Sequence, residues 1–257
     1  MKLSELIDPT SKEEILIASK ILKKDKVWIL ANPNVEVENL DDLKKAIERY
    51  RSGYPLHYIT KEKEFMGLVF ELEEGVFIPR YETEDLVEKA IEIIEEHGLK
   101  LIAEIGVGCG AIGISIAKFT GVRVVGTDVS KRAVEISLRN AKKHNVEDLF
   151  EVRLGKFLEP FEDIYDEIDM IVSNPPYVEE DYVPPEDVAH EPREAIFSGD
   201  GFDFFREFFK RYDVSGKFVL MEFPGKGKER IVEIAKTKVE FLKGIDGVER
   251  FFLISPS

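Results

Sequence analysis

The chain has 257 residues, of which 44% are hydrophobic, and this suits a globular protein with a sizeable core. Its 36 basic and 51 acidic residues give a formal charge of −15, which opposes binding to long nucleic acid because that affinity depends on Lys and Arg contacts to phosphates. The sequence has no apolar run of roughly 20 residues, no signal peptide and only one cysteine, Cys109, so we expect a cytoplasmic protein with neither a membrane span nor a bound metal.

Residues 9–53 have the periodicity of helices. Ser11 with Glu14 three positions later predicts a capping box at the start of a first helix. A second run places apolar residues at spacings of three and four before Gly53 stops it. These apolar residues are Leu40, Leu43, Ile47 and Tyr50. We predict a small helical domain over residues 1–54.

The period changes after about residue 56. Apolar residues alternate from Leu68 to Leu72 and predict a strand. Glu73, Glu74 and Gly75 predict a turn, and residues 76–79 predict the returning strand. We therefore predict a β-hairpin linker over residues 55–80.

Helix and strand patterns alternate from residue 81 to the end of the chain. Thr83 is placed to cap a helix that Gly98 ends. The predicted strands are LIAEI, VRVVGTD, LFEVRL, DMIVSN, KFVLMEF, VEFL and RFFLIS. This alternation predicts an α/β domain over residues 81–257, in which helices cover both faces of a mostly parallel sheet and ligands bind beyond the carboxyl ends of its strands.

A glycine-rich loop follows the first of these strands. Gly106, Gly108 and Gly110 let the backbone turn sharply and approach a ligand, and the next helix directs its N-terminal amides to the same place. Asp128 ends the second strand, where an acid can accept hydrogen bonds from both hydroxyls of a ribose. Because Gly108, Gly110 and Gly113 also satisfy the dinucleotide fingerprint, this loop alone leaves both NAD and S-adenosylmethionine open.

The segment IVSNPPY follows the fourth strand and so lies beside the glycine loop. Its two prolines cannot donate hydrogen bonds to a sheet, so the strand must end there. An amide nitrogen is a poor nucleophile, and two fixed oxygens that accept hydrogen bonds from its N–H groups can activate and orient it. Asn174 supplies one oxygen from its side chain and Pro175 the other from its backbone, while Tyr177 offers a flat wall. These features predict methyl transfer to an amide-like nitrogen, whereas a dehydrogenase leaves the segment unused.

Eight short segments spread over most of the chain form one ordered pattern. They are RSGYP at 51–55, HYI at 57–59, EFMGL at 64–68, FIPR at 77–80, ETE at 82–84, the glycine loop, NPPY at 174–177 and EPREAIF at 191–197. In this order they resemble the landmarks of the peptide-chain-release-factor glutamine N5-methyltransferases, an NPPY-motif family of S-adenosylmethionine-dependent enzymes. The NPPY motif is shared with nucleic-acid methyltransferases, so the segments before the glycine loop carry the specificity of the resemblance.

The resemblance implies a Rossmann-like, seven-stranded methyltransferase domain with an antiparallel last strand, preceded by a hairpin linker and a helical domain that docks the release factor. The implied reaction transfers a methyl group from S-adenosylmethionine to N5 of the glutamine in a Gly-Gly-Gln motif, and we expect a monomer. The implied cofactor-binding residues are Gly106, Val107, Gly108, Cys109, Gly110, Asp128, Phe157 and Asn174. The implied substrate-binding residues are Phe77, Arg80, Asn174, Pro175, Pro176 and Tyr177, with Asn174, Pro175 and Tyr177 catalytic.

Four features depart from the family pattern, one of which is a helical domain shorter than is usual in the family. Lys156 stands where the family usually carries an acid near the adenine, Tyr81 replaces a proline, and residues 222–224 replace a usual Glu-x-Gly. Two other functions stay open beside the main one. A methyltransferase acting on adenine N6 or guanine N2 would use the same pocket chemistry, although the charge of −15 argues against it. A non-catalytic S-adenosylmethionine-binding protein is the second.

Overall fold

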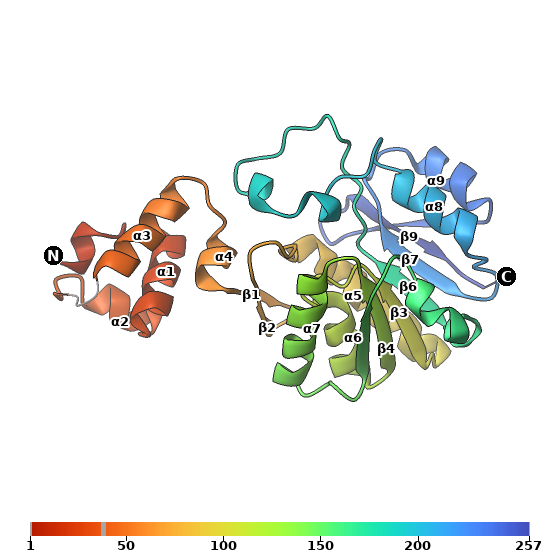
Figure 1. The fold of residues 1–257 in the computed structure, drawn as a ribbon, viewed down its shortest axis with the longest axis horizontal. Coiled ribbons are helices and arrows are strands. Elements are labelled where there is room, and N and C mark those ends of the chain that lie inside the picture. Colours follow the sequence, from red (N-terminus) through yellow and green to blue (C-terminus); the bar gives the residue numbers. More distant parts are fainter. Residues whose placement is uncertain (1, 37–39, 257) are drawn as a thin grey trace. The chain divides into compact units, whose positions relative to one another are not determined.

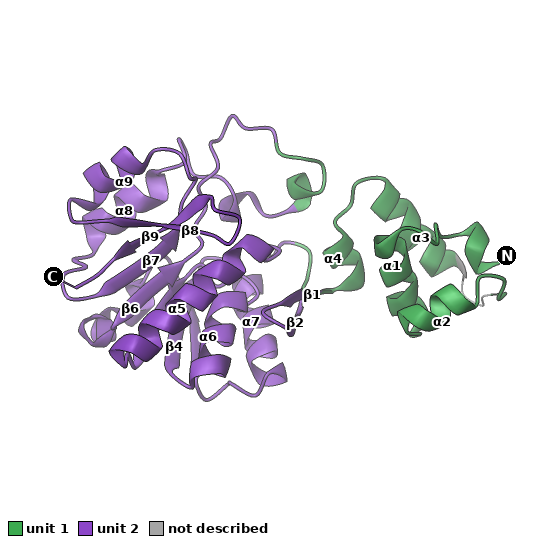
Figure 2. Ribbon diagram, turned by 180° about the vertical axis from the view of Figure 1, so that it is seen from behind, with its two compact units in different colours: residues 1–62, 72–74, 184–190 green, residues 63–71, 75–183, 191–257 purple. Residues whose placement is uncertain are grey.

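The computed structural model describes residues 2–36 and 40–256 and divides into two compact units (Figure 2). Unit 1 comprises residues 1–62, 72–74 and 184–190, and unit 2 comprises residues 63–71, 75–183 and 191–257. Within the described ranges, no helix has both the length and the apolar character needed to cross a membrane.

Unit 1 is helical, as predicted. Its helices are α1 (Lys12–Leu22), α2 (Lys26–Ala31), α3 (Leu40–Arg51) and α4 (Leu56–Thr60), after a 3-10 turn at Leu3–Glu5. Ser11 caps α1, because its hydroxyl accepts a hydrogen bond from the Glu14 N–H at 3.2 Å. The other half of the predicted capping box is wrong: the buried Glu14 carboxylate instead pairs with both Arg51 Nε and Nη2 at 2.8 Å. A guanidinium offers a buried carboxylate two charge-assisted bonds, which are stronger than one backbone N–H.

A β-hairpin follows within the predicted range 55–80, and the predicted strand that starts at Leu68 is present, but the turn and the pairing strand differ from the predicted ones. Strands β1 (Glu62–Phe65) and β2 (Leu68–Glu71) pair with each other, and the turn between them has positive φ at Met66 (52°) and Gly67 (70°). Such a turn matches the twist of the strands it joins. The predicted returning strand at 76–79 is wrong, since these residues are in no strand. The N–H of Ile78 donates instead to the Glu191 carboxylate at 3.0 Å.

Unit 2 contains a seven-stranded sheet of order β5-β4-β3-β6-β7-β9-β8, in which β9 pairs antiparallel with both β7 and β8 and the other pairs are parallel (Figure 1). Its strands are β3 (Leu101–Ile105), β4 (Arg123–Asp128), β5 (Phe150–Leu154), β6 (Met170–Ser173), β7 (Phe218–Glu222), β8 (Glu240–Lys243) and β9 (Glu249–Ile254). Its α-helices are α5 (Glu84–His97), α6 (Ala111–Thr120), α7 (Lys131–Lys143), α8 (Asp203–Arg211) and α9 (Lys228–Ala235). The predicted α/β architecture and antiparallel last strand are confirmed.

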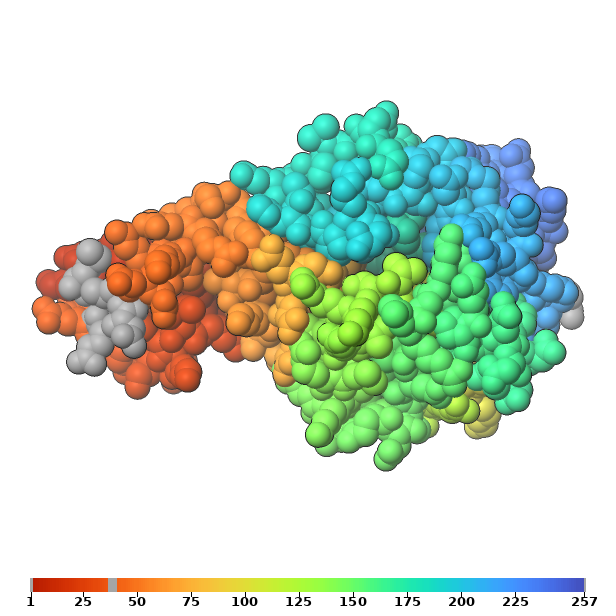
Figure 3. Space-filling view, in the orientation of Figure 1, coloured from red at the N-terminus to blue at the C-terminus, as the bar shows by residue number. Residues whose placement is uncertain are grey.

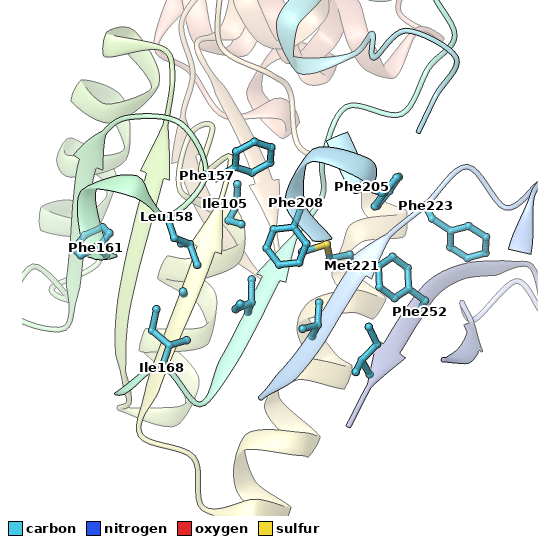
Figure 4. Close-up of a cluster of buried hydrophobic side chains, with 14 of the residues drawn as sticks. Ile105, Phe157, Leu158, Phe161, Ile168, Phe205, Phe208, Met221, Phe223 and Phe252 are labelled. Atoms are coloured by element: carbon cyan, nitrogen blue, oxygen red, sulfur yellow. The ribbon is translucent and has the colours of Figure 1, made fainter. Parts of the chain in front are cut away.

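The two faces of this sheet are covered by different helices. One face carries α8, α9 and the 3-10 segment Glu159–Glu167, and the other carries α5, α6 and α7. Because successive side chains of a strand point to opposite faces, Ala103 and Ile105 join the core under α8, while Glu104 between them faces α6. Figure 4 shows Phe157 close to Ile105 at one end of this core, with Phe208 over the middle of the sheet.

The order of the strands reverses next to β3. This strand pairs in parallel with β4 on one side and β6 on the other, and Ile105 lies opposite both Thr127 and Ser173. The Ser173 hydroxyl donates to the Ile105 carbonyl at 2.7 Å and ties the two strand ends together. The loops after β3, β4 and β6 therefore start side by side at the edge where a doubly wound sheet binds its ligands.

Asn140 on α7 joins the hairpin to the glycine loop. Its Oδ1 accepts from the Glu71 N–H at 2.7 Å, and its Nδ2 donates to the carbonyls of Glu71 at 3.1 Å and Cys109 at 2.9 Å. The side chain is fully buried, so water cannot replace these bonds.

We predict that Asn140→Ala lowers the free energy of unfolding by roughly 1–3 kcal/mol for each buried partner that it leaves unpaired. Arg139→Ala is the matched control, because it breaks an ion pair with the exposed side chain of the same Glu71 and should cost under about 1 kcal/mol. Urea unfolding of both variants measures the difference. Equal losses would show that the Asn140 bonds contribute no more than a surface pair.

Candidate active site

A cavity of about 270 Å³ lies in unit 2 at the carboxyl ends of β3, β4 and β6. Its walls come from the glycine loop, from the ends of β4 and β5, from the segment after the hairpin, from the NPPY segment and from residues 192–195. In Figure 3 the green residues near 130–155 adjoin the cyan residues near 190–205 on this side of unit 2. The predicted location of the ligand site is where the cavity lies.

The glycine loop forms one wall of the cavity. Gly106 (φ +76°) and Gly108 (φ +54°) have open space where a Cβ would stand, so the backbone there is uncovered. Val107 and Cys109 also line the cavity, and burial raises the pKa of the Cys109 thiol to about 12, which keeps it uncharged. Gly110 does not line the cavity. Its φ is +87°, and a Cβ there would meet the Ile114 side chain at 2.5 Å. The glycine at 110 is therefore required by packing at the start of α6.

Asp128 stands at the end of β4 on the cavity wall. The Gly108 N–H donates to Oδ2 at 2.9 Å, and the Ser130 N–H donates to Oδ1 at 2.8 Å. Burial raises the pKa of Asp128, while these two backbone donors lower it. Ser130, and not Asp128, accepts from the Ala133 N–H and caps α7. Each carboxylate oxygen of Asp128 keeps a lone pair for a donor in the cavity.

Glu104 is a cavity residue that the sequence analysis missed. Its Oε2 accepts from the Gly113 N–H at 2.9 Å, and its Oε1 is buried with no hydrogen-bond partner among the described residues. Burial raises the pKa of this carboxyl well above its ordinary value. The signal was an acid inside the otherwise apolar strand LIAEI, directly before the glycine loop. A buried carboxylate oxygen without a partner suits a cationic or N–H group of a ligand.

Phe157 forms an aromatic wall beside the loop that follows β5. Its backbone has φ +49°, unusual for a residue with a side chain, and its carbonyl accepts from the Thr127 hydroxyl. The centre of its ring lies 5.1 Å from the centre of the Phe204 ring, and both residues line the cavity. Lys156, the departure from the family pattern, pairs with both oxygens of Glu207 on α8, at 2.7 and 2.6 Å.

The NPPY segment joins a chain of hydrogen bonds that starts at the cavity. Asn174 lines the cavity, and its Nδ2 donates to the Thr83 hydroxyl at 3.0 Å. Thr83 donates to Glu222 Oε2 at 3.0 Å, and Tyr177 donates to Glu222 Oε1 at 2.5 Å. Pro176 lines the cavity as well, whereas Pro175 and Tyr177 do not.

Thr83 stands at the N-cap position of α5, but the prediction that its side chain caps the helix is wrong. Its hydroxyl is committed to Glu222, which is only 4% exposed at the end of β7. An N-cap hydroxyl acts as an acceptor of a first-turn N–H, and the Thr83 hydroxyl accepts from Asn174 Nδ2 instead. The backbone of Thr83 is also helical (φ −77°, ψ −12°), whereas an N-cap residue is usually extended. The contact between Thr83 and Glu222 could not be predicted from local sequence spacing, because 139 positions separate the two residues.

The segment after the hairpin supplies the opposite wall. Phe77 lines the cavity, and the Arg80 guanidinium lies 4.9 Å from the centre of its ring. Arg80 does not line the cavity but pairs with Glu191, whose side chain is 1% exposed. Glu191 thus holds Arg80 by its side chain and Ile78 by its backbone N–H. The role of this acid was missed, although its segment EPREAIF was recognised.

Two family models match separate parts of the chain. The methyltransferase small domain matches residues 83–191, and the PrmC N-terminal domain matches residues 3–60. In the described structure these stretches contain the glycine loop with the NPPY segment and the four helices of unit 1.

Curated relatives match most of the chain. A release factor glutamine methyltransferase of Clostridium acetobutylicum is 39% identical over 198 residues, covering 74% of this chain and 70% of its own. One of Dictyoglomus turgidum is 37% identical over 209 residues, covering 80% and 74%. One of Bacillus cereus is 33% identical over 253 residues, covering 91% and 89%.

Solved structures share the fold at lower identity. The human Mettl16 catalytic domain in complex with the MAT2A 3′UTR hairpin 6 has a TM-score of 0.57 at 19% identity and covers 84% of this chain and 82% of its own. This likeness supports the methyltransferase fold alone. On the strength of the curated relatives, the chain belongs to the release factor glutamine methyltransferases, which are S-adenosylmethionine-dependent enzymes.

Proposed function

We propose that this enzyme transfers the methyl group of S-adenosylmethionine to N5 of the glutamine in the Gly-Gly-Gln motif of a peptide chain release factor. One observation carries the proposal: the Asn174 amide lies at the rim of the same cavity that the glycine loop and Asp128 form. The names of the curated relatives favour a release factor over a nucleic acid as the substrate.

The residues of the cavity fit S-adenosylmethionine by their chemistry. The open backbone at Gly106 and Gly108 leaves room for the methionine part, and the unpaired Glu104 Oε1 suits its ammonium group. Asp128 has lone pairs for the ribose hydroxyls, and Phe157 offers an apolar wall for the adenine. Val107, Cys109 and Asn174 complete the proposed cofactor site, while Gly110 serves it indirectly through the start of α6.

The chemistry at the substrate amide needs two acceptors and a confined nitrogen. The sulfonium of the bound cofactor supplies an activated methyl group. Asn174 Oδ1 would accept a hydrogen bond from one substrate N–H, which orients the nitrogen and stabilises positive charge that develops on it. The second acceptor would be the carbonyl of Pro175, which lies next in the chain to Asn174 although Pro175 itself does not line the cavity. Transfer would form the bond from the nitrogen to the methyl carbon as the bond from sulfur to that carbon breaks, leaving S-adenosylhomocysteine as a neutral thioether, and the nitrogen would lose one proton to water. Pro176 and Phe77 confine the side chain, while Tyr177 and Arg80 support these walls from outside the cavity.

The remaining expectations also stand as proposals. We propose that residues 1–54 dock the release factor, that residues 55–80 link them to the catalytic domain at 81–257, and that the enzyme acts as a cytoplasmic monomer. The charge of −15 supports the absence of long nucleic acid among its partners.

Methyl transfer to separate substrates tests the function directly. With radiolabelled S-adenosylmethionine, we expect label on a purified release factor and none on the same factor with its Gly-Gly-Gln glutamine replaced. Duplex DNA and total RNA serve as the competing substrates. Label on nucleic acid alone would mean that the proposed substrate is wrong and that the pocket serves a base amine.

The glycine loop offers a test with a matched control. Gly106→Ala puts a Cβ into the proposed cofactor space and should weaken S-adenosylmethionine binding roughly tenfold or more. Gly121→Ala introduces a Cβ at a similar φ (+71°) and also into open space, but away from the cavity. It should cost stability through the same backbone strain and leave the affinity unchanged. Calorimetry measures the affinity of both variants for S-adenosylmethionine. If the two affinities were equal, Gly106 would not be part of the cofactor site.

Asn174→Ala should lower the rate of methyl transfer by roughly 10²–10³, by analogy with removing one oxyanion-hole donor, which costs about 2.7–4 kcal/mol. The affinity for S-adenosylmethionine should change far less, because the other cavity residues remain. Single-turnover transfer and calorimetry separate the two effects. A variant with the rate of the parent enzyme would contradict the amide mechanism.

A further inference from the structure

The side chain that orients the substrate amide must itself be oriented. A primary amide has nearly equal halves, one a hydrogen-bond acceptor and the other a donor of two N–H groups. Asn174 can activate a substrate amide only with Oδ1 turned toward it. If the Asn174 amide were turned by 180°, its own N–H groups would face the N–H groups of the substrate amide. Two sets of donors would then meet, and the site would repel its substrate.

The hydrogen-bond chain behind Asn174 selects one orientation. Glu222 accepts from Thr83 at one oxygen and from Tyr177 at the other. The single hydroxyl proton of Thr83 therefore points at Glu222, and toward Asn174 that hydroxyl offers only a lone pair. Only the NH₂ half of the amide can meet a lone pair, as the 3.0 Å bond from Nδ2 shows. Oδ1 is left facing away from Thr83, and no described residue donates to it.

Burial makes this orientation hard to reverse. Thr83 lines the cavity but is only 3% exposed, and Glu222 is 4% exposed, so water has little access to either partner. The pKa of Glu222 is raised, chiefly by burial, although the hydrogen bonds from Tyr177 and Thr83 and the charge of Arg250 lower it. The acceptor role of Glu222 follows from the geometry, since each of its two carboxyl oxygens faces one hydroxyl donor.

Thr83 lacks the side-chain cap bond that is usual at the start of a helix, and it takes part in this hydrogen-bond chain instead. A threonine at the N-cap of a helix usually accepts a hydrogen bond from a backbone N–H of the first turn, which is worth about 1 kcal/mol. Thr83 makes no such bond. Its hydroxyl instead joins residues that come from three separate places: the start of α5, the end of β7 and the loop after β6.

We propose that Thr83 and Glu222 are positioning residues that hold the Asn174 amide with Oδ1 toward the substrate, and that they thereby make the site select a primary amide over a carboxylate. A substrate carboxylate has no N–H to donate to Oδ1. Its oxygen lone pairs would instead face those of Oδ1, and the two oxygens would repel each other. This inference rests on the proposed function, because it acts through the role given there to Asn174.

Thr83→Val tests the proposal, since valine keeps the shape of the side chain and removes the hydroxyl. The Asn174 amide then loses the partner that sets its orientation, and we expect kcat with release factor to fall about tenfold, the value of one hydrogen bond. The KM for S-adenosylmethionine should stay unchanged. Thr83→Ser retains the hydroxyl and should restore most of kcat. Thr120→Val is the matched control, because its hydroxyl bonds only within and just after α6.

Two further measurements separate positioning from general support. In the Asn174→Ala background, Thr83→Val should add no further loss of rate, because it has no amide left to orient. In addition, the affinity of the enzyme can be measured for the release factor and for its glutamine-to-glutamate variant. The ratio of these two affinities should be smaller for Thr83→Val than for the parent enzyme.

The outcomes are distinguishable. Parent-like kcat in Thr83→Val, loss of kcat in Thr83→Ser, or an undiminished loss in the Asn174→Ala background would each overturn the positioning role. If Asn174→Ala itself retains the rate of the parent enzyme, the proposed function fails first. If Asn174→Ala loses activity and Thr83→Val has the kcat of the parent enzyme, the proposed function is supported. Only the positioning role of Thr83 would then be wrong.

Discussion

The parallel pairing of β3 with both β4 and β6 is the constraint on which the site depends. It sets Ile105 between Thr127 and Ser173, so the residues that follow each strand meet at one edge of the sheet. Gly106, Asp128 and Asn174 thus become neighbours although they are far apart in the sequence. The Ser173 hydroxyl on the Ile105 carbonyl secures the pairing at the point where the two loops leave the sheet.

Buried polar side chains then hold the loops in place. Asn140 ties the hairpin to the glycine loop, Glu191 holds the segment that carries Phe77, and Glu222 anchors Thr83 and Tyr177. Each of these groups would be costly in a core without its partners, and each connects elements that are distant in the chain. The cavity is therefore shaped by a polar framework around it as much as by the residues that line it.

The chain's departures from the family pattern are compensated locally. The charge of Lys156 is matched by Glu207 from α8. Tyr81, 63% exposed, has the Lys63 ammonium 3.8 Å from the centre of its ring. Pro224 and Phe223 follow Glu222 without disturbing its two hydrogen bonds, so the carboxylate at the end of β7 keeps its place.

The sequence by itself determined the α/β class, nearly all strands and helices of unit 2, and two of the loops that line the cavity, the glycine loop and the NPPY segment. These features depend on periodicity, on glycine and proline, and on short-range capping, which act over a few residues. The hairpin turn at Met66–Gly67, the partner of Glu14 and the partner of Thr83 were decided only by the tertiary structure. For Glu14, the distant Arg51 replaces the local backbone N–H of the predicted capping box. For Thr83, the hydroxyl accepts from the distant Asn174 instead of from a first-turn N–H, and donates to the buried Glu222. No local pattern records such a partner, and the same physics explains why Glu104, Glu191 and Glu222 emerged as site residues only once the sheet had brought them together.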